Sequence, residues 1–400
     1  RQMSTSAHVG TSHHVDSTAA GRDAALAARE GLGGRTPSVA LVFASADHDH
    51  GLLLAAIQAA LPGVPLVGCT GEGVIAHDES NETLAAAAVM AIASDRVRFE
   101  TVLIDDYGRD PVAAGRTLAA RVNAAGPDVR CLCVMPDGLH GNCTELLRVL
   151  HAELEVPMPI IGGAAADAMT FDGTWQYGEG RVVTGGLAAL IVSGPVDVEV
   201  AVSHGCTALG LERAVTREAS GWIHEIDGQP AWRLFKEYLG SDADDLNAEG
   251  IVHLCVGERL AHASPAYDPL VIRTPTALDA ATGALFFPGG GLTEGRAIQF
   301  TRRDPEKIRA SVRETASRLR ASHPDRAPDV VFQFDCAGRG RILWGGGASA
   351  EIVAPLRQTL GAATPWIGFH TYGEIAPIAG TPYYHNYSVA LCALYEREAA

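Results

Sequence analysis

The sequence lacks a long apolar run, a basic cluster and any cysteine pair at C-x-x-C spacing. Its longest apolar stretch, Leu84 to Ala93, is far shorter than the roughly 20 residues that a membrane helix needs, and the polar N-terminus has no apolar signal core. The 31 Lys and Arg residues form no run longer than Arg302-Arg303, and the formal net charge is −16. We therefore expect a cytoplasmic protein whose main partners are neither membranes nor nucleic acids.

The eight cysteines are scattered singly, without a Cys/His cluster at zinc spacing. In a reducing compartment such residues are usually free, buried thiols, and this is what we expect here. Residues 1–20 begin with a stretch rich in Ser, Thr, Gly and His, which predicts a flexible tail.

One pattern occurs three times in the chain. Each copy has an apolar strand, an amphipathic helix, a Pro-marked turn, a second strand that ends in a Gly-rich loop, and a third apolar strand. The copies span residues 38–93, 129–193 and 330–396. Near-continuous apolar strands such as "VALVF" and "CLCV" are typical of sheets that are covered on both faces. The pattern predicts an α/β fold of repeated strand-helix-strand units, with mixed sheets because each third strand can return antiparallel.

A chain of 400 residues is longer than one hydrophobic core usually serves, so we expect two modules. Gly and Pro punctuate the pattern at "DGQPAW", residues 227–232. We place a first module with two α/β units at 21–228 and a second module at 229–400.

The loops after the second strands, "GCTGEGVI", "GGAAADAM" and "GFHTYGEI", combine glycines with a carboxylate: Glu72, Asp167 and Glu374. In open α/β sheets, ligands gather at the carboxyl ends of strands, where glycines allow close approach to the backbone. Alternatively, the glycines only make turns and the carboxylates cap the next segment. Because three loops share this form, we expect at least one to bind a ligand.

A further segment, "CAGRG", follows the strand "VVFQF" and directs Cys336 and Arg339 toward the same end of the sheet as Glu374. A guanidinium suits bidentate capture of a carboxylate or phosphate, and Arg339 is thus a candidate anchor for an anionic ligand. The alternative is an ion pair with Glu351 or Glu374. We also expect His370 and Tyr372 to share a face, with Glu374 turned toward Arg339 or the ligand.

These three loops, together with "CAGRG" and "YHN" at 384–386, resemble the FIST sensory family, with an N-terminal and a C-terminal FIST module in succession. The resemblance implies a cytoplasmic signal-transduction protein that binds a small ligand and works with a histidine kinase or a cyclic-dinucleotide enzyme. Because no output domain follows residue 400, we expect any output to act through a partner chain. The candidate ligand-binding residues are Cys69, Glu72, Asp167, Cys336, Arg339, His370, Tyr372, Gly373, Glu374 and Asn386.

Two alternatives stay open. Some members of this family are haem-based nitric-oxide sensors, and His385 and His204 are then the candidate haem ligands. An enzyme of unknown reaction is the other: "MPDGLHGNC" contains Asp137, His140 and Cys143, although groups that act together usually converge from separate segments. We assign no catalytic residue and leave the cofactor unknown.

Overall fold

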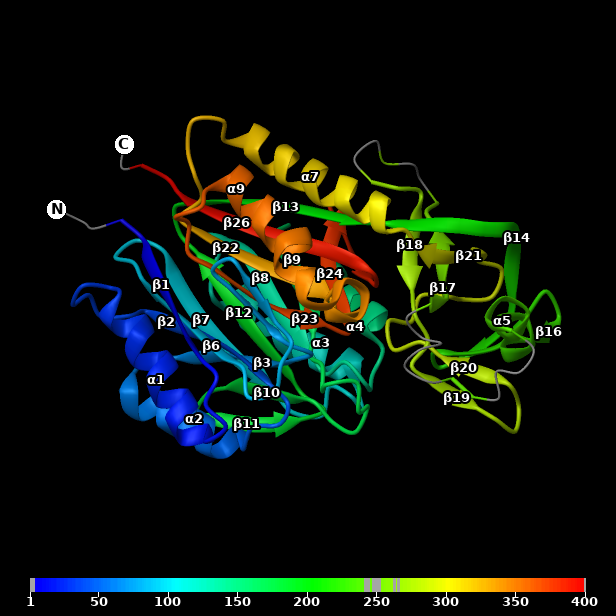
Figure 1. The fold of residues 1–400 in the computed structure, drawn as a ribbon, viewed down its shortest axis with the longest axis horizontal. Coiled ribbons are helices and arrows are strands. Elements are labelled where there is room, and N and C mark those ends of the chain that lie inside the picture. The colour runs from blue at the N-terminus through cyan, green and yellow to red at the C-terminus, as the bar shows by residue number, and fades with distance from the viewer. Residues whose placement is uncertain (1–3, 241–244, 247–252, 262–263, 265–266, 399–400) are drawn as a thin grey trace.

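The computed structural model describes residues 4–240, 245–246, 253–261, 264 and 267–398. Figure 1 shows a body of three sheets with helices outside them, and a smaller lobe beside the body. The α/β class and the mixed sheets predicted from the repeats are confirmed.

Each body sheet contains the three strands of one repeat and strands from elsewhere in the chain. The first sheet has the order β1 (Ser6–Ser12), β6 (Ala87–Ala93), β2 (Val39–Ser45), β3 (Leu66–Gly71), β10 (Trp175–Gly178) and β11 (Arg181–Thr184). The second has β25 (Thr381–His385), β24 (Gly373–Ile378), β9 (Ile160–Ala164), β8 (Val129–Pro136), β12 (Leu187–Ser193) and β7 (Arg98–Ile104). The third has β13 (Val196–His204), β26 (Ser388–Glu396), β22 (Val330–Cys336), β23 (Trp366–Thr371), β4 (Val74–Ala76) and β5 (Glu79–Asn81).

The three repeats share one local topology. The first two strands of each pair in parallel, as in β2 with β3, β8 with β9 and β22 with β23. The third strand returns antiparallel to the first, as β6, β12 and β26 do. The helices that precede the second and third repeats begin at Asp110-Pro111 and Asp304-Pro305, where the aspartate caps the helix and proline occupies the first turn.

Alternation along the strands divides the apolar side chains between two kinds of core. Val39, Leu41 and Phe43 of β2 enter a central core that all three sheets share, whereas Ala40 and Val42 face the helices. The helices α1 (Ser17–Glu30) and α2 (His50–Ala60) cover the first sheet, α3 (Pro111–Ala124) and α4 (Cys143–Glu153) the second, and α7 (Pro305–Ser322) and α9 (Ala354–Leu360) the third. Burial on both faces explains why the strands read as near-continuous apolar runs.

A hairpin after the second strand of each repeat joins the sheet of another repeat. The pair β4–β5 lies beside β23, the pair β10–β11 beside β3, and the pair β24–β25 beside β9. The repeats are therefore interlocked in a ring by main-chain hydrogen bonds. How the chain divides into modules at residues 228 and 229 stays a prediction.

The predicted flexible tail at residues 1–20 is wrong for its described part. Strand β1 pairs with β6 along its whole length, Val9 is 2% exposed, and Asp16 caps helix α1. The segment is polar because β1 is an edge strand with one half-exposed face, and main-chain pairing, not apolar composition, holds it in place.

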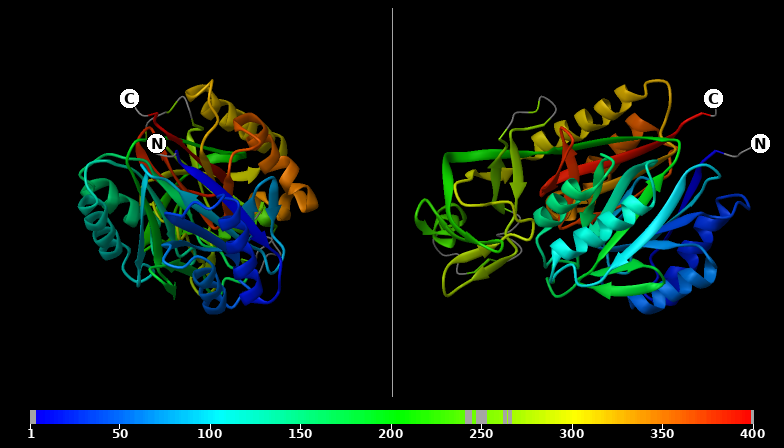
Figure 2. Two further views of the ribbon diagram at one scale, coloured as in Figure 1. Left: turned by 90° about the vertical axis from the view of Figure 1, so that its left-hand side faces the viewer. Right: turned by 180° about the vertical axis from the view of Figure 1, so that it is seen from behind.

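The lobe is an eight-stranded sheet with one described helix, α5 (Ala231–Leu239). Its strands are β14 (Cys206–Ala219), β15 (Trp222–Ile226), β16 (Gln229–Pro230), β17 (Cys255–Arg259), β18 (Leu270–Arg273), β19 (Ala277–Asp279), β20 (Ala284–Phe286) and β21 (Ala297–Arg303). The chain enters the lobe through β14 and leaves through β21, and these two strands pair with each other. The view from behind in Figure 2 shows this ribbon joining the lobe to the body.

The remaining short helical turns connect β22 to α9. They are η1 (Ala337–Arg339), α8 (Arg341–Trp344), η2 (Gly345–Gly347) and η3 (Ser349–Val353).

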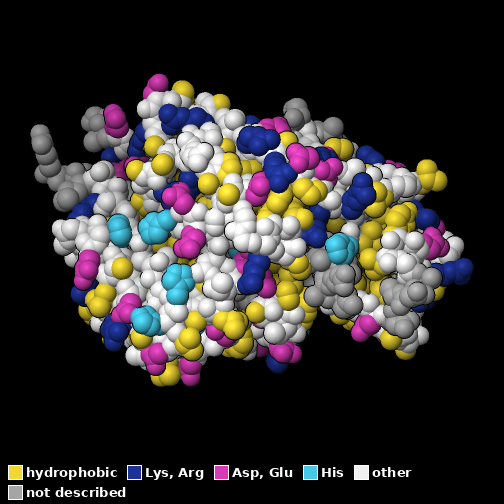
Figure 3. Space-filling model, in the orientation of Figure 1, with side chains coloured by type: hydrophobic (Ala, Val, Ile, Leu, Met, Phe, Trp, Pro, Cys, Tyr) yellow, Lys and Arg dark blue, Asp and Glu magenta, His cyan; other side chains and the backbone are white. Residues whose placement is uncertain are grey.

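On the face shown in Figure 3, the coloured Lys and Arg side chains are interspersed with Asp and Glu. Among the described residues, no helix has the length and apolar character to cross a membrane. All eight cysteines are buried and free, as predicted.

Candidate functional site

The three Gly-rich loops meet in the body, at the carboxyl ends of their strands. One amide in each loop donates to a carbonyl of the preceding loop in the ring. The bonds run from Glu72 N to His370 O (2.9 Å), from Ala166 N to Thr70 O (3.0 Å) and from Tyr372 N to Ala164 O (3.1 Å). The three loops therefore make equivalent main-chain contacts with one another.

The carboxylates of the loops do not occupy matching positions. The ring of bonds makes Glu72 equivalent to Ala166 and Tyr372, whereas Asp167 lies one residue later and Glu374 two residues later. Three similar sequences thus place three carboxylates in different surroundings, and each has its own chemistry.

Asp167 organises the loop that follows β9. Its buried carboxylate accepts hydrogen bonds from the Tyr372 hydroxyl (2.5 Å) and from the amides of Phe171, Asp172 and Gly173 (3.1, 2.7 and 2.9 Å). Phe171 has a φ of 57° and stacks on Tyr372 with ring centroids 5.4 Å apart. The carboxylate therefore fixes the position of two aromatic rings.

Glu72 is half-buried where the loops meet. Its buried Oε2 has no hydrogen-bond partner in the part of the chain that the structure describes. Burial, then the Glu82 carboxylate and then Asp167 raise the pKa of Glu72 to about 8. Much of the Glu72 population is therefore neutral at pH 7 and has a proton to donate.

His370 and Tyr372 do not share a set of contacts, so the prediction of a common face is wrong. The fully buried His370 ring lies 2.7 Å from Ser80 Oγ and 3.7 Å from Glu82, whereas Tyr372 contacts Asp167. Strand β23 ends at Thr371, and the strict alternation that the prediction assumed ends with it.

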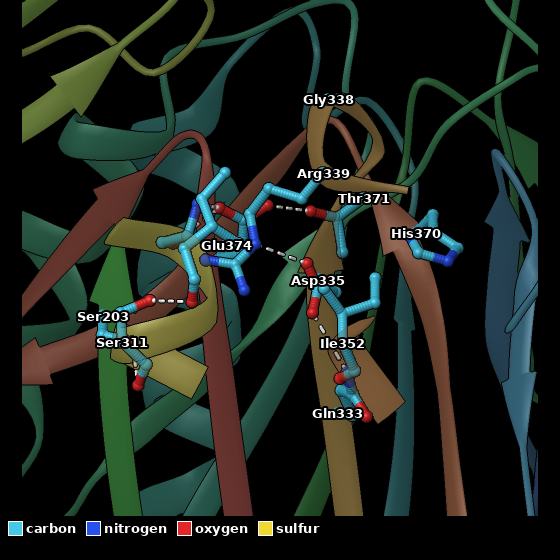
Figure 4. Close-up of polar contacts among 12 residues, drawn as sticks. Ser203, Ser311, Gln333, Asp335, Gly338, Arg339, Ile352, His370, Thr371 and Glu374 are labelled. Atoms are coloured by element: carbon cyan, nitrogen blue, oxygen red, sulfur yellow. Dashed lines mark hydrogen bonds and ion pairs between the residues drawn. The ribbon is translucent and has the colours of Figure 1, made fainter. Parts of the chain in front are cut away.

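Glu374 on β24 of the second sheet and Arg339 on η1 are both fully buried (Figure 4). Glu374 accepts hydrogen bonds from the Thr371 hydroxyl and from Ser388 N and Oγ (3.1 and 2.6 Å). Arg339 Nε donates to Asp335 Oδ1 (2.9 Å), and its two terminal nitrogens have no partner among the described residues. The pKa of Glu374 is raised to about 8, because burial, aided by the Asp335 carboxylate, outweighs the hydrogen bonds from Ser388 and Thr371.

The alternative of an ion pair between Arg339 and Glu351 or Glu374 is therefore wrong. Neither Glu351 nor Glu374 forms its ion pair, because Glu351 pairs with Arg309 (2.7 Å) on the surface side of η3. Asp335 stands four residues before Arg339 inside the apolar strand β22, whose pattern does not indicate a charge pair.

Two other predicted residues hold the Tyr372 main chain in place. Asn386 Nδ2 donates to Tyr372 O (2.7 Å), and its Oδ1 accepts from Thr274 N of the lobe (2.9 Å). A Cβ at Gly373 would lie 1.9 Å from the Tyr384 ring, so only glycine fits there. Asn386 thus connects the loop "GFHTYGEI", which contains Tyr372, to the lobe.

The predicted cysteines differ in their surroundings. Cys69 is buried within β3, and Cys336 lines a small cavity of about 30 Å³ together with Tyr372, Asn386 and Phe171. Burial raises the pKa of both thiols well above the usual value. Neither is a thiolate at neutral pH.

A cleft of about 720 Å³ lies between the body and the lobe. The body contributes the loops before α3 and α4 and the loop at Phe171, and the lobe contributes β15, β19 and β20. Phe171 and Thr276 line both this cleft and the small cavity at Tyr372 and Cys336. The sequence did not predict the cleft, because its lobe side comes from the least regular stretch of the pattern.

His140, one of the three residues of the enzyme alternative, lines the cleft. His140 Nδ1 lies 2.8 Å from Asp137 Oδ2, whereas the Cys143 thiol is 2% exposed and burial raises its pKa to about 12. Asp137 and His140 therefore form a pair, and Cys143 is no nucleophile beside them.

Neither candidate haem ligand fits a haem iron. The fully buried His385 ring has both nitrogens engaged, with Ala376 O (3.0 Å) and the Tyr267 hydroxyl (3.0 Å). His204 Nδ1 accepts from Cys206 N (3.0 Å), and its other nitrogen lies 3.4 Å from Asp268 in a cavity of about 300 Å³ that is also lined by Lys307. A polar lining of this kind does not suit the apolar porphyrin face.

Two family models together match most of this chain. The model of the FIST N domain matches residues 38–229, and the model of the FIST C domain matches residues 231–377. The uncharacterized protein Rv0628c of Mycobacterium tuberculosis is 29% identical over 96% of this chain and 98% of its own length. The uncharacterized protein Mb0898c of Mycobacterium bovis is 28% identical over 96% of this chain and 97% of its own length.

Sequence identity to solved structures is lower than identity to these relatives. A chorismatase aligns over 98% of this chain and 99% of its own with 10% identity and a TM-score of 0.36. A cyanuric acid hydrolase from A. caulinodans aligns over 99% of this chain and 100% of its own with 10% identity and a TM-score of 0.39.

Proposed function

Because the chain belongs to the FIST family, with an N-terminal and a C-terminal FIST domain in succession, we propose that it is a cytoplasmic sensory protein that binds a small ligand. Its partner in signal transduction would be a histidine kinase or another signalling protein, as the family resemblance implies. No catalytic role is part of this proposal.

The observation that carries the proposal is the cleft of about 720 Å³ between the body and the lobe. Its volume is within the range of small-molecule sites, and it lies where two structural parts meet, a common place for such sites. Among the ten candidate ligand-binding residues, Tyr372, Cys336 and Asn386 line the adjoining small cavity and are the proposed contacts. We assign Arg339, Glu374 and the others to holding the loops in place.

The connection between lobe and body gives ligand binding a route to a signal. The lobe is joined through the paired strands β14 and β21, and Asn386 bonds both Tyr372 and Thr274 across the boundary. A ligand that contacts both parts would favour one arrangement of lobe and body over others, which a partner protein can recognise.

The test is a thermal-shift screen of small metabolites on the parent and on Ala277→Trp, which fills the cleft from its lobe side. Ala280→Trp, at an exposed position outside the cleft, is the matched control. We expect compounds that stabilise the parent and Ala280→Trp to lose their effect on Ala277→Trp. Compounds that stabilise all three proteins equally would remove the cleft from the proposal.

A further inference from the structure

The two sides of the cleft present aromatic rings. From the lobe, Trp222 and Phe286 form a cross-strand pair with ring centroids 5.3 Å apart. From the body, Phe171 lines the cleft and stacks on Tyr372 behind it, with an interplanar angle of 25°. Each of Trp222, Phe286 and Phe171 is only partly buried. The cleft therefore has apolar, polarisable surface on both sides for a flat ligand.

The ring of Phe171 is held in this position by the main chain. Its φ of 57° is a left-handed conformation that side chains with a Cβ rarely adopt, and its amide donates to Asp167 (3.1 Å). Because Asp167 also binds Tyr372 at 2.5 Å, the stacked pair is fixed before any ligand enters.

The cleft also has one well-oriented polar group, the His140 imidazole. Its Nδ1 lies 2.8 Å from Asp137 Oδ2, and the other oxygen of Asp137 accepts from Leu139 N (3.0 Å) and Thr174 Oγ1 (2.8 Å). A carboxylate on Nδ1 favours the tautomer with the proton on that nitrogen, and this leaves Nε2 as an acceptor. The His140 side chain is 64% exposed and lines the cleft, so Nε2 is accessible to a ligand.

The charged residues of the cleft do not favour a ligand that carries a net charge. Glu145 is paired with Arg148 (2.9 Å), and Arg109 lies on the rim with a side chain that is 84% exposed. The first amides of α4 are bonded to Pro288 O and Gly289 O, so this helix end offers them to no anion. A neutral ligand matches such a lining better than a carboxylate, a phosphate or an amine.

We propose that the cleft binds a neutral, planar aromatic compound that carries an O–H or N–H donor, a class that includes phenols and indoles. The ring lies between Phe171 and the Trp222–Phe286 pair, and the donor forms a hydrogen bond with Nε2 of His140. Asp137 is a positioning residue, since it sets the tautomer of His140 without reaching the ligand. This inference rests on the proposed function, because it names the ligand class of the same cleft.

The test uses two probes with the same ring system, 2-naphthol and 2-methoxynaphthalene, in isothermal titration calorimetry. Only 2-naphthol can donate to His140. One hydrogen bond at a partly exposed site is worth about 1 kcal/mol, so we expect the parent to prefer 2-naphthol about 5-fold. In His140→Phe the two probes should bind alike, whereas His151→Phe, at an exposed position on α4 outside the cleft, should keep the preference.

The variant Asp137→Asn tests whether Asp137 sets the tautomer of His140, without removing the hydrogen bonds that Asp137 makes in the fold. The asparagine oxygen can still accept from Leu139 and Thr174, and its NH₂ group donates to His140 Nδ1, which moves the imidazole proton to Nε2. Nε2 then donates to either probe, so the preference should disappear while the melting temperature stays near that of the parent. A retained preference in a folded Asp137→Asn would refute the tautomer argument.

The inference and the proposed function fail separately. If the parent binds both probes equally, or neither up to its solubility limit, while metabolites from the screen lose their effect on Ala277→Trp, the ligand class is wrong and the cleft stands. If the probes bind Ala277→Trp as tightly as the parent, the cleft is not their site and this inference is overturned. The proposed function is overturned only if the metabolites of the screen also stabilise the parent and Ala277→Trp equally.

Discussion

Replacing Glu374 by Gln should remove a pH dependence from the free energy of unfolding. Glu374 is fully buried, and the groups around it fit either a protonated acid or an amide. In Glu374→Gln, the NH₂ group can donate to Thr371 Oγ1 and the oxygen can accept from Ser388 N and Oγ. The variant should therefore fold with the same contacts as the neutral acid.

The sign and size of the effect follow from the pKa of Glu374. Burial raises it from 4.5 to about 8 in the folded protein. Since the folded pKa is the higher one, the stabilisation by the bound proton is complete below pH 4.5 and is lost as the pH rises through 8. The slope is about 1.4 kcal/mol per pH unit and falls off near pH 8, so the parent should lose about 3.5 kcal/mol between pH 5 and pH 8 through this group.

Urea unfolding of both proteins at pH 5, 6.5 and 8 measures this loss. Glu72 and every other titrating group are common to both proteins, so their contributions cancel in the difference between them. We expect the stability of Glu374→Gln relative to the parent to increase by about 3.5 kcal/mol from pH 5 to pH 8. A difference that stays constant across this range would show that Glu374 is ionised in the folded state and would refute the reasoning.

Three further predictions concern other parts of the chain. Tyr372→Phe removes the hydroxyl that Asp167 accepts from and should cost about 1–2 kcal/mol in urea unfolding, whereas an unchanged stability would mean that this bond is not formed in solution. Val9→Ala should cost about 2 kcal/mol in the same assay because β1 is part of the first sheet, and no loss would favour the flexible tail after all. A thiol reagent should titrate eight cysteines in unfolded protein that has not been reduced and few in native protein, and rapid reaction of most native thiols would contradict their burial.

The repeats were predictable from the sequence because local patterns determine them. Apolar strands, Pro-marked turns and the caps at Asp110 and Asp304 recur at matching places, and each third strand returned antiparallel as expected. The exchange of hairpins was not predictable, since β5 is the polar tripeptide Glu79–Asn81 and its place depends on three sheets coming together. Strand β1 was missed for the same reason, because its pairing with β6 is non-local.

The candidate site was predicted less completely than the fold. The sequence located the loops and Tyr372, but it aligned Glu72, Asp167 and Glu374 by spacing alone, and the ring of main-chain bonds gives them different positions. It also missed the lobe side of the cleft, since Trp222 and Phe286 belong to short strands in the irregular stretch. The one available signal was "MPDGLHGNC", where Asp137 and His140 are three residues apart before a helix.

A crystal structure of the protein with the tightest-binding compound from the metabolite screen tests the central claim most directly. The account predicts electron density for the compound in the cleft, between Phe171 of the body and Trp222 of the lobe. Density elsewhere, for example in the cavity beside His204, with the cleft filled only by solvent, would contradict it.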